Sequence, residues 1–389
     1  MNILLLTHYE TVGGRRQLEI NTLRQAGHSV QVVAWNSSGK EYQYDFPVTY
    51  IHNRSRVYFS QSLLKKGLLA TLWTIGGLYP RTLKMILATR WDVLHCCNLA
   101  LLPLAVLGKW LKGGKIIFDS YEMPILKVPL RIKNRGLAAI TRLVLENTER
   151  FLVSQVDGVL TIPAVGGHEK KKFARYCNNV EVLMNVPDLQ GIVSHKDYPQ
   201  PPTAIFFGGL NREKGLFAML EAAALLVKPY PNFRLILIGY MFENPAAVQE
   251  TIDRLGIRDH VVLHSWVPTD KLGEYLAHAW VGLWPSQPCG HYTQVTTGNS
   301  RKGFQYMKYG LPIVGTTFGE IATHVAEEGA GLLVDCTRPE ALAAAMAEIF
   351  EHPELREKMS ANGLAAVRTK YNWESESKKL LKVYRALEG

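Results

Sequence analysis

The feature of this sequence that most limits its fold is a repeated order of short apolar run, glycine-containing turn and helical stretch. At the N-terminus, the apolar run Ile3–Leu6 is followed by Gly13 and Gly14, a helical stretch over Arg15–Ala26, and a second apolar run at Ser29–Ala34. Apolar runs joined in this way predict βαβ units in a parallel sheet. Ligands of such sheets bind beyond the carboxyl ends of the strands, where Gly13 and Gly14 are expected to lie.

The same order of elements begins again in the second half of the chain. With 389 residues, the chain is longer than one hydrophobic core usually organises, so we expect two domains. The polar, proline-containing stretch from Asn185 to Thr203 indicates a linker, and the apolar run Ala204–Phe207 opens the second series. The prediction is an α/β chain with two doubly wound, Rossmann-like domains, residues 1–186 and 203–372, and a cleft between them.

Composition and charge exclude several classes of protein. Hydrophobic residues make up 47% of the chain and charged residues 20%, which is typical of a globular protein. The formal charge of +10 favours anionic partners, but no nucleic-acid-binding motif accompanies it, so nucleic acid is not an expected partner. Five cysteines without a C-x-x-C spacing favour neither a disulfide framework nor a zinc site, and indicate a reducing cytoplasm.

We expect neither a signal peptide nor a transmembrane segment. The N-terminus has no basic region, and the longest uncharged stretch, Gly67–Pro80, is shorter than the roughly 20 residues that span a bilayer. Two basic, amphipathic stretches, Arg54–Arg90 and Lys127–Arg150, leave two interpretations open. Each is either a solvated helix face packed on the sheet or a peripheral contact with anionic lipid at the inner face of the membrane.

Polar residues follow two further apolar runs in the first half. Asp92–Asn98 contains His95 and ends at Asn98, and Lys115–Glu122 ends at Glu122. Parallel strands place their carboxyl ends at one edge of the sheet, so we expect these side chains near Gly13 and Gly14. Two interpretations stay open: His95 is a satisfied histidine of the core, or these strand ends form a site with His95, Asn98 and Glu122 as the candidate catalytic residues.

The stretch Asn299–Val314 predicts a short helix that ends at Gly310 and Pro312 before a buried strand. Gly298, Asn299 and Ser300 precede this helix. The first turn of a helix offers unpaired N–H groups and a positive dipole end, which is a suitable place for a phosphate.

Taken in order, these pieces resemble the GT-B glycosyltransferases of the retaining family 4 type, also called group 1, over nearly the whole chain. The resemblance is carried by Gly13-Gly14, Ala26–Val30, Asp92–His95, Asp119–Glu122, Asn185–Asp188, Gly208–Gly215, Phe304–Val314 and Tyr371–Trp373. It implies that the last helix, residues 373–389, crosses back to complete the N-terminal domain. It also implies that a nucleotide-diphosphate sugar binds mainly on the C-terminal domain.

The resemblance assigns most of the donor-binding residues. Lys214 matches the lysine that meets the donor phosphates in this family, and base contacts are expected near Gly239 and Trp266. The residues expected to bind the nucleotide sugar and its phosphates are Gly13, Gly14, Gly209, Arg212, Lys214, Gly239, Trp266, Gly298, Asn299, Ser300, Arg301, Gln305 and Glu320.

The chain also departs from the family pattern. Gly209 stands where the family usually has an arginine, and Arg212 is the candidate to replace its charge. Thr297 and Gln305 stand where the family has a pair of glutamates, although members with a Lys-x-Phe-Glu-Tyr-Met motif also lack the first one. Gln305 keeps one carbonyl oxygen that can accept a hydrogen bond from the ribose.

The resemblance implies a retaining transfer from the nucleotide sugar to a glycan or lipid-linked acceptor, as in polysaccharide or glycoconjugate biosynthesis. No Asp-x-Asp triplet is present, so neither a metal nor another cofactor is expected, and the cations of the protein would stabilise the leaving diphosphate. Two alternatives stay open. One is a nucleotide-sugar epimerase of the same fold, and the other is a catalytically silent scaffold that binds a partner or a glycan.

Overall fold

The computed structural model describes residues 1–52, 67–120, 132, 134–163, 168–193, 195–265, 267, 269–288 and 301–388. The chain forms two compact units, one of Met1–Leu183 with Glu376–Gly389 and one of Met184–Ser375. The stretch expected to be a linker lies within the second unit, and the first unit takes up the C-terminal helix at Glu376 rather than at Trp373.

The first unit is built on a parallel sheet. Its strands, as far as the structure describes the unit, lie in the order β3-β2-β1-β4-β5-β6-β7. The strands are β1 (Asn2–Thr7), β2 (Ser29–Asn36), β3 (Val48–His52), β4 (Val93–Cys96), β5 (Lys115–Ser120), β6 (Gly158–Thr161) and β7 (Val180–Val182). The helices are α1 (Arg15–Gln25), α3 (Gly67–Ala88), α4 (Leu102–Lys112), α6 (Arg135–Val153), α7 (His168–Phe173) and α16 (Trp373–Arg385).

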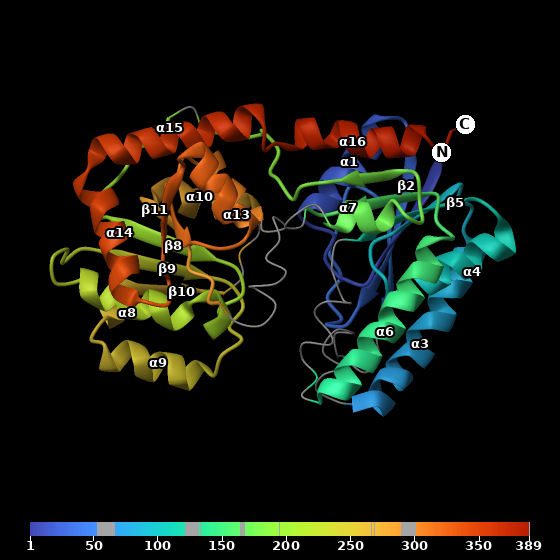
Figure 1. The fold of residues 1–389 in the computed structure, drawn as a ribbon, viewed down its shortest axis with the longest axis horizontal. Helices are drawn as coiled ribbons and strands as arrows, with labels where there is room; N and C mark the ends of the chain where they lie inside the picture. The colour runs from blue at the N-terminus through green and yellow to red at the C-terminus, as the bar shows by residue number, and fades with distance from the viewer. Residues whose placement is uncertain are drawn as a thin grey trace. The chain divides into compact units, whose positions relative to one another are not determined.

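Strand order reverses between β1 and β4, which are neighbours in the sheet and pair in parallel. Alternate residues of each strand face opposite sides. On one side, Leu94 and Phe118 belong to an apolar cluster that also includes residues of α3, α4 and α6, and Figure 1 shows these three helices side by side. On the other side, His95 and Asp119 contact Tyr384 of α16 and Arg15 of α1.

The second unit contains another parallel sheet, and its described strands lie in the order β10-β9-β8-β11-β12-β13. The strands are β8 (Thr203–Phe207), β9 (Arg234–Ile238), β10 (Val261–His264), β11 (Val281–Trp284), β12 (Ile313–Thr316) and β13 (Gly331–Val334). The helices are the 3₁₀ turns η3 (Arg212–Lys214) and η4 (Arg258–His260), and α8 (Leu216–Leu226), α9 (Pro245–Arg254), α10 (Thr269–His278), α12 (Arg301–Lys308), α13 (Glu320–Glu328), α14 (Pro339–Glu351) and α15 (Pro353–Thr369).

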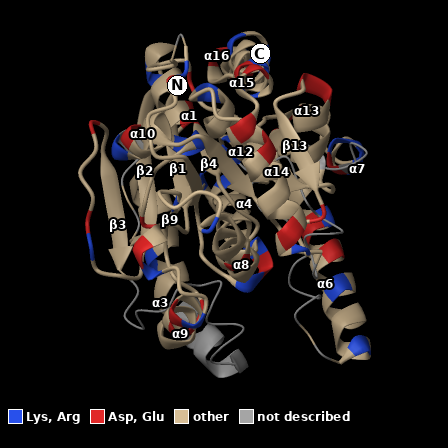
Figure 2. Ribbon diagram, turned by 90° about the vertical axis from the view of Figure 1, so that its left-hand side faces the viewer, with Lys and Arg blue, Asp and Glu red and all other residues tan. Residues whose placement is uncertain are grey.

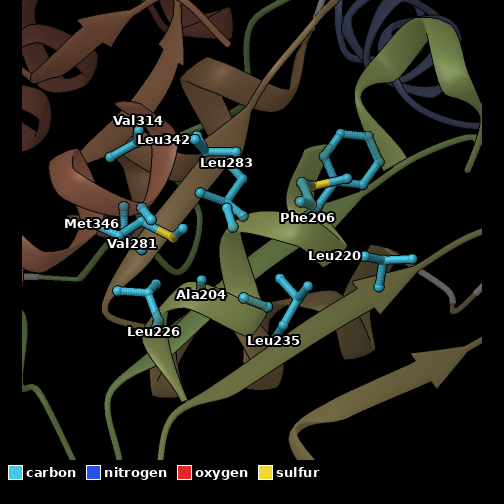
Figure 3. Close-up of a cluster of buried hydrophobic side chains, with 14 of the residues drawn as sticks. Ala204, Phe206, Leu220, Leu226, Leu235, Val281, Leu283, Val314, Leu342 and Met346 are labelled. Atoms are coloured by element: carbon cyan, nitrogen blue, oxygen red, sulfur yellow. The ribbon is translucent and has the colours of Figure 1, made fainter. Parts of the chain in front are cut away.

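Helices cover both faces of this second sheet. One apolar cluster joins strand residues such as Phe206 and Leu283 to α8, α9 and α14, and Figure 3 shows part of it. A second cluster joins Ile205 and Ile313 on the opposite face to α10, α12, α13 and α15. Gly282 faces α12, and a Cβ there would lie 2.4 Å from the Tyr306 ring, so this strand position has room only for glycine.

The predicted fold class, two doubly wound parallel sheets, is confirmed. The predicted helix over Arg54–Arg90 is observed as α3 from Gly67 to Ala88, while residues 53–66 lie outside the described part. The second amphipathic stretch, Lys127–Arg150, is observed as α6 from Arg135 onward. Among the described helices, none has the combination of length and apolarity needed to cross a bilayer.

Candidate functional site

A cavity of about 280 Å³ lies at the carboxyl ends of β8 and β9 in the second unit. Four residues predicted to bind the donor take part in its wall: Gly209, Gly239, Arg301 and Gln305. The complete wall is formed by Phe207, Gly208, Gly209, Ile238, Gly239, Tyr240, Val267, Leu272, Arg301 and Gln305. Four separate segments of the unit thus form the cavity wall, which has an apolar side and a polar side.

A second hollow of about 520 Å³ lies near the amino end of β9, where Phe233 and Arg234 contribute to its wall together with Pro201 and Asp259. It contains none of the predicted site residues. Ligands of doubly wound sheets bind at the carboxyl ends of the strands, so we take the smaller cavity as the candidate site.

Two glycines bring the ends of β8 and β9 close together at the cavity. Gly208 has φ +132° and Gly239 has φ +147°, which side chains rarely tolerate. A Cβ on Gly239 would lie 1.8 Å from the carbonyl oxygen of Gly208. This part of the wall is therefore made of backbone, which allows a ligand to approach the peptide groups closely.

The loop after β8 positions Lys214. The Asn211 side chain accepts a hydrogen bond from the Lys214 backbone nitrogen at 2.9 Å. The loop ends at Gly215, which has φ +79° and where a Cβ would lie 2.2 Å from the carbonyl oxygen of Pro285. The Lys214 ammonium lies 3.3 Å from the place a Cβ on Gly209 would occupy. The predicted phosphate-binding lysine is thus held beside a residue of the cavity wall.

Arg212 is placed differently from Lys214. Its guanidinium carbon lies 4.4 Å from the centroid of the Phe217 ring, and its backbone nitrogen donates to Glu243 at 2.7 Å. Arg212 does not belong to the cavity wall. Its predicted role as the replacement for the family arginine at Gly209 gains no support from this position.

Gln305 and Arg301 lie one turn apart on α12, and both reach the cavity. The Gln305 side chain is buried. In the amide orientation that satisfies both groups, its oxygen accepts from Arg301 Nε at 3.1 Å and Nη2 at 3.2 Å. The neutral amide that replaces the family glutamate thus has an arginine as its hydrogen-bond donor.

Several predicted site residues lie outside the described part of the chain. They are Glu122, Trp266, Gly298, Asn299 and Ser300. Glu320 opens α13, and its side chain is not described. The first turn of α12 that was expected to meet a phosphate is thus described only from Arg301 onward.

In the first unit, polar side chains meet at the point where strand order reverses. His8 follows β1 and Asn98 follows β4, and the Asn98 amide nitrogen is hydrogen-bonded to Nδ1 of His8. The Asn98 carbonyl oxygen accepts from the Leu101 backbone nitrogen at 3.0 Å, which fixes the turn into α4. Gly13 is exposed after β1, and Gly14, with φ 65°, is the N-cap of α1. His8 was not among the predicted site residues, although it directly follows strand β1.

The structure does not place His95 where a catalytic residue was predicted. His95 lies within β4 and not after it, and its side chain has no exposed surface. Its Nδ1 lies 2.8 Å from the hydroxyl oxygen of Tyr384 on α16. His95 therefore packs between the sheet and α16, because side chains of the strand interior are covered by the helices on that face.

His95 borders a buried cluster of charges. Arg15 pairs with Glu19 at 2.8 Å, donates to the carboxylate of Asp119, and donates to the Leu183 carbonyl oxygen at 3.2 Å. Burial raises the pKa of Asp119, but the Arg15 charge and the His95 hydrogen bond outweigh it, and the pKa is lowered to about 2. Burial raises the pKa of Glu19, despite Arg15 beside it. The cluster joins α1, β4 and β5.

His95, Cys97 and Asp119 also present ligand atoms within 4.8 Å of one another, a spacing that suits a metal ion. However, Asp119 is already paired with Arg15, and a dication would lie close to that guanidinium. Burial raises the pKa of the Cys97 thiol well above its usual value, which disfavours the thiolate that metals bind. The donor set therefore suits a structural ion pair better than a metal centre.

Comparison with known proteins gives a consistent result. Residues 192–365 match the family model described as "Glycosyl transferases group 1". The chain is 30% identical to a D-inositol 3-phosphate glycosyltransferase of Corynebacterium urealyticum over 47% of this chain and 42% of that protein. It is 26% identical to the protein of the same name from Segniliparus rotundus over 71% of this chain and 64% of that one. The chain thus spans less than two thirds of the length of either relative.

The fold of a solved structure from Anabaena is similar over the whole chain. That protein, Alr3699/HepE in complex with UDP and glucose, superimposes with a TM-score of 0.71 at 15% identity, and 99% of each chain is covered. At this identity the likeness establishes the fold alone. The predicted resemblance to GT-B, group 1 glycosyltransferases is confirmed.

The buried cluster leads to a prediction for Asp119→Asn. This substitution removes one of the two buried carboxylate charges that Arg15 contacts, so we expect the free energy of unfolding of the first unit to fall by about 3–5 kcal/mol. Because the pKa of Asp119 is lowered from 3.8 to about 2, its ionised form stabilises the folded protein above pH 3.8, and this contribution is lost as the pH falls toward 2. Urea unfolding at several pH values measures both effects.

Asp45→Asn is the matched control, because Asp45 pairs with Arg24 at an exposed site. We expect it to change stability by less than about 1 kcal/mol. If Asp119→Asn keeps the wild-type slope of stability between pH 4 and pH 2, the assignment of that slope to Asp119 is wrong.

Proposed function

We propose that this chain is a retaining glycosyltransferase that transfers a hexose from a nucleoside diphosphate sugar, and that the donor binds in the cavity of the second unit. One observation carries the proposal. Gly209, Gly239, Arg301 and Gln305 were assigned to donor binding independently of the cavity, and all four contribute to its wall. The match of residues 192–365 to group 1 glycosyl transferases supports the same reaction.

The chemistry of the wall suggests how the nucleotide lies. The base fits the apolar side, formed by Ile238, Tyr240 and Leu272. The ribose hydroxyls fit the polar side at Gln305, whose amide can both donate and accept hydrogen bonds. The diphosphate then lies along the backbone of Gly208 and Gly209, beside the Lys214 ammonium.

Lys214 has the central chemical role in this proposal. Cleavage of the bond between the sugar and the phosphate leaves negative charge on the departing diphosphate. A fixed ammonium beside that position stabilises the charge as it develops in the transition state. In a retaining transfer of this type, the departing phosphate oxygen accepts the proton of the acceptor hydroxyl on the same face of the sugar. The reaction therefore needs neither a metal nor another cofactor.

The acceptor is proposed to be a glycan or a lipid-linked sugar. Asn98 and its neighbour His8 are proposed to contact sugar hydroxyls from the first unit, while Glu122 keeps its predicted role outside the described residues. A cytoplasmic location is proposed from the cysteines, because Cys96, Cys97, Cys177 and Cys336 are buried free thiols.

A surface on the first unit favours peripheral contact with an anionic membrane. Large apolar side chains on α6 and the end of α4 are each more than half exposed. This α6 surface consists of Trp110, Leu111, Leu137, Ile140, Leu143, Val144 and Phe151. On α6 these side chains recur at helical spacing and form a stripe along the helix. Trp110 and Phe151 join the two helices, with their ring centroids 6.4 Å apart.

The charges around the α6 surface fit anionic lipid. Helix α6 contains Arg135, Arg142 and Arg150, and Figure 2 shows basic residues spaced along it with acidic ones toward one end. Of its two glutamates, Glu149 is buried against Lys172. Apolar side chains flanked by arginines are the pattern of helices that rest in the lipid head-group region. We therefore propose that this surface holds the enzyme at a membrane where a lipid-linked acceptor is found.

The two alternatives make different predictions. A nucleotide-sugar epimerase would convert the donor without any acceptor. A silent scaffold would bind nucleotide sugars without hydrolysis or transfer. Lys214 beside the cavity favours a reaction that expels a diphosphate, so the transferase remains the proposed function.

The test of the donor site begins with thermal unfolding in the presence of UDP-, GDP- and ADP-sugars, because a bound donor raises the unfolding temperature. With the donor so identified, Lys214→Ala is expected to lower kcat/KM for donor turnover by roughly 10²-fold, the scale of losing one charge-stabilising donor. Lys228→Ala, which removes an exposed lysine of the same unit, should retain wild-type turnover. Equal turnover in both variants would refute the phosphate role of Lys214.

The membrane proposal is tested by flotation with vesicles. Wild-type protein should float with vesicles of equal parts phosphatidylglycerol and phosphatidylcholine, and much less with phosphatidylcholine alone. The double substitution Ile140→Glu and Leu143→Glu places charges in the apolar stripe and should abolish flotation. Leu225→Glu, at an exposed leucine of the second unit, is the control. Equal flotation of wild type and double variant would show that α6 is not the contact.

A further inference from the structure

The cavity of the second unit lacks one cation that its family resemblance leads us to expect. Gly209 replaces the usual arginine of the loop after β8. A Cβ on Gly209 would lie 2.8 Å from the Phe242 ring and 3.3 Å from the Lys214 ammonium. An arginine at position 209 would thus have its Cβ against an aromatic ring and another cation.

Lys302 brings an ammonium to the neighbouring position from a different element. It is the second residue of α12, and its side chain extends to the end of β8. Its Nζ would lie 3.4 Å from a Cβ on Gly208, and it lies 3.4 Å from the centroid of the Phe206 ring. Two consecutive glycines of the loop, Gly208 and Gly209, are therefore flanked by two ammonium groups, one from Lys302 and one from Lys214.

The Lys302 ammonium has no anionic partner within the described ranges of the chain. The ammonium lies over the faces of Phe206 and, at 5.9 Å, Phe207. Aromatic faces attract a cation but do not neutralise its charge. Burial and the nearby charge of Lys214 lower the pKa of Lys302 well below its usual value. Burial and the charge of Lys214 both destabilise the charged form of Lys302. An anion placed between the two ammonium groups would offset this cost and would therefore be bound favourably.

We propose that Lys302 is a phosphate-binding residue that supplies, from α12, the positive charge that Gly209 does not supply from the loop after β8. The ligand is the diphosphate of a nucleoside diphosphate or of its sugar, which the two ammonium groups hold over Gly208 and Gly209. This inference rests on the proposed donor site. It replaces Arg212, whose guanidinium lies on Phe217, as the compensating cation.

Phe206 explains how the lysine is held ready for the ligand. The ring belongs to the apolar core beneath β8, where it is fully buried, so its position is fixed by packing. The Lys302 ammonium rests on that ring, directly beside the backbone of Gly208. A phosphate at Gly208 would therefore meet an amino group that is already in place, and little side-chain entropy would be lost on binding.

The experiment measures binding by calorimetry and separates the phosphates from the base. UDP, GDP and ADP are titrated into the full chain, and uridine, guanosine and adenosine serve as the ligands without phosphate. For the diphosphate that binds best, Lys302→Met should weaken binding about 10- to 100-fold, the range for losing a hydrogen bond to a charged group. Binding of the matching nucleoside should be unchanged, and Lys302→Arg should retain most of the diphosphate affinity.

Controls make each outcome decisive. Lys271→Met removes an exposed lysine from α10 and should bind as the wild type does. Thermal unfolding without ligand shows whether Lys302→Met is folded, and Lys302→Arg tests the charge if it is not. If Lys302→Met binds the diphosphate within twofold of wild type, the phosphate-binding role of Lys302 is wrong. The proposed donor site would still stand in that case, particularly if Lys214→Ala weakens diphosphate binding. Failure of wild type to bind any of the three diphosphates would overturn the proposed function as well.

Discussion

The candidate site depends on the close approach of two backbone segments at the ends of β8 and β9. The carbonyl oxygen of Gly208 occupies the space that a Cβ on Gly239 would need. Because Gly239 has no room for a Cβ and Gly208 has φ +132°, which side chains rarely tolerate, this part of the cavity wall is peptide backbone. Specific side chains then reach the cavity from elsewhere, with Arg301 and Gln305 coming from α12.

The two units differ in whether a buried or partly buried cation has an anionic partner. In the first unit, Arg15 is paired with both Glu19 and Asp119, and the low pKa of Asp119 shows that this carboxylate is well compensated. In the second unit, the Lys302 ammonium lies on the Phe206 ring and has no anionic partner among the described residues, although it is partly buried. A compensated cluster stabilises a fold, whereas an ammonium without a counter-ion beside a cavity is suited to binding an anion.

Much of the fold could be predicted from the sequence, because buried parallel strands leave continuous apolar runs. The apolar runs Ser29–Ala34 and Ala204–Phe207 agree with the observed strands β2 and β8 to within two residues. The strands that contain His95 and Asp119 were also predicted, but the directions in which these two side chains point were not. Whether a strand residue faces a helix or follows the strand end depends on where the strand stops, and β4 ends at Cys96, one residue beyond His95. Sequence patterns do not resolve that boundary.

The donor site was predicted less completely. Glycines and the polar residues of α12 carry a motif, whereas Tyr240 and Leu272 contribute only apolar surface and have no signature. Lys302 stood inside a recognised motif, yet only the fold brings it to Gly208. The most direct measurement is a crystal structure with the nucleoside diphosphate that binds most tightly. We expect its phosphates within hydrogen-bonding distance of the Lys214 and Lys302 ammonium groups and its ribose at Gln305. A nucleotide bound elsewhere, for example in the hollow beside Arg234 and Asp259, would contradict it.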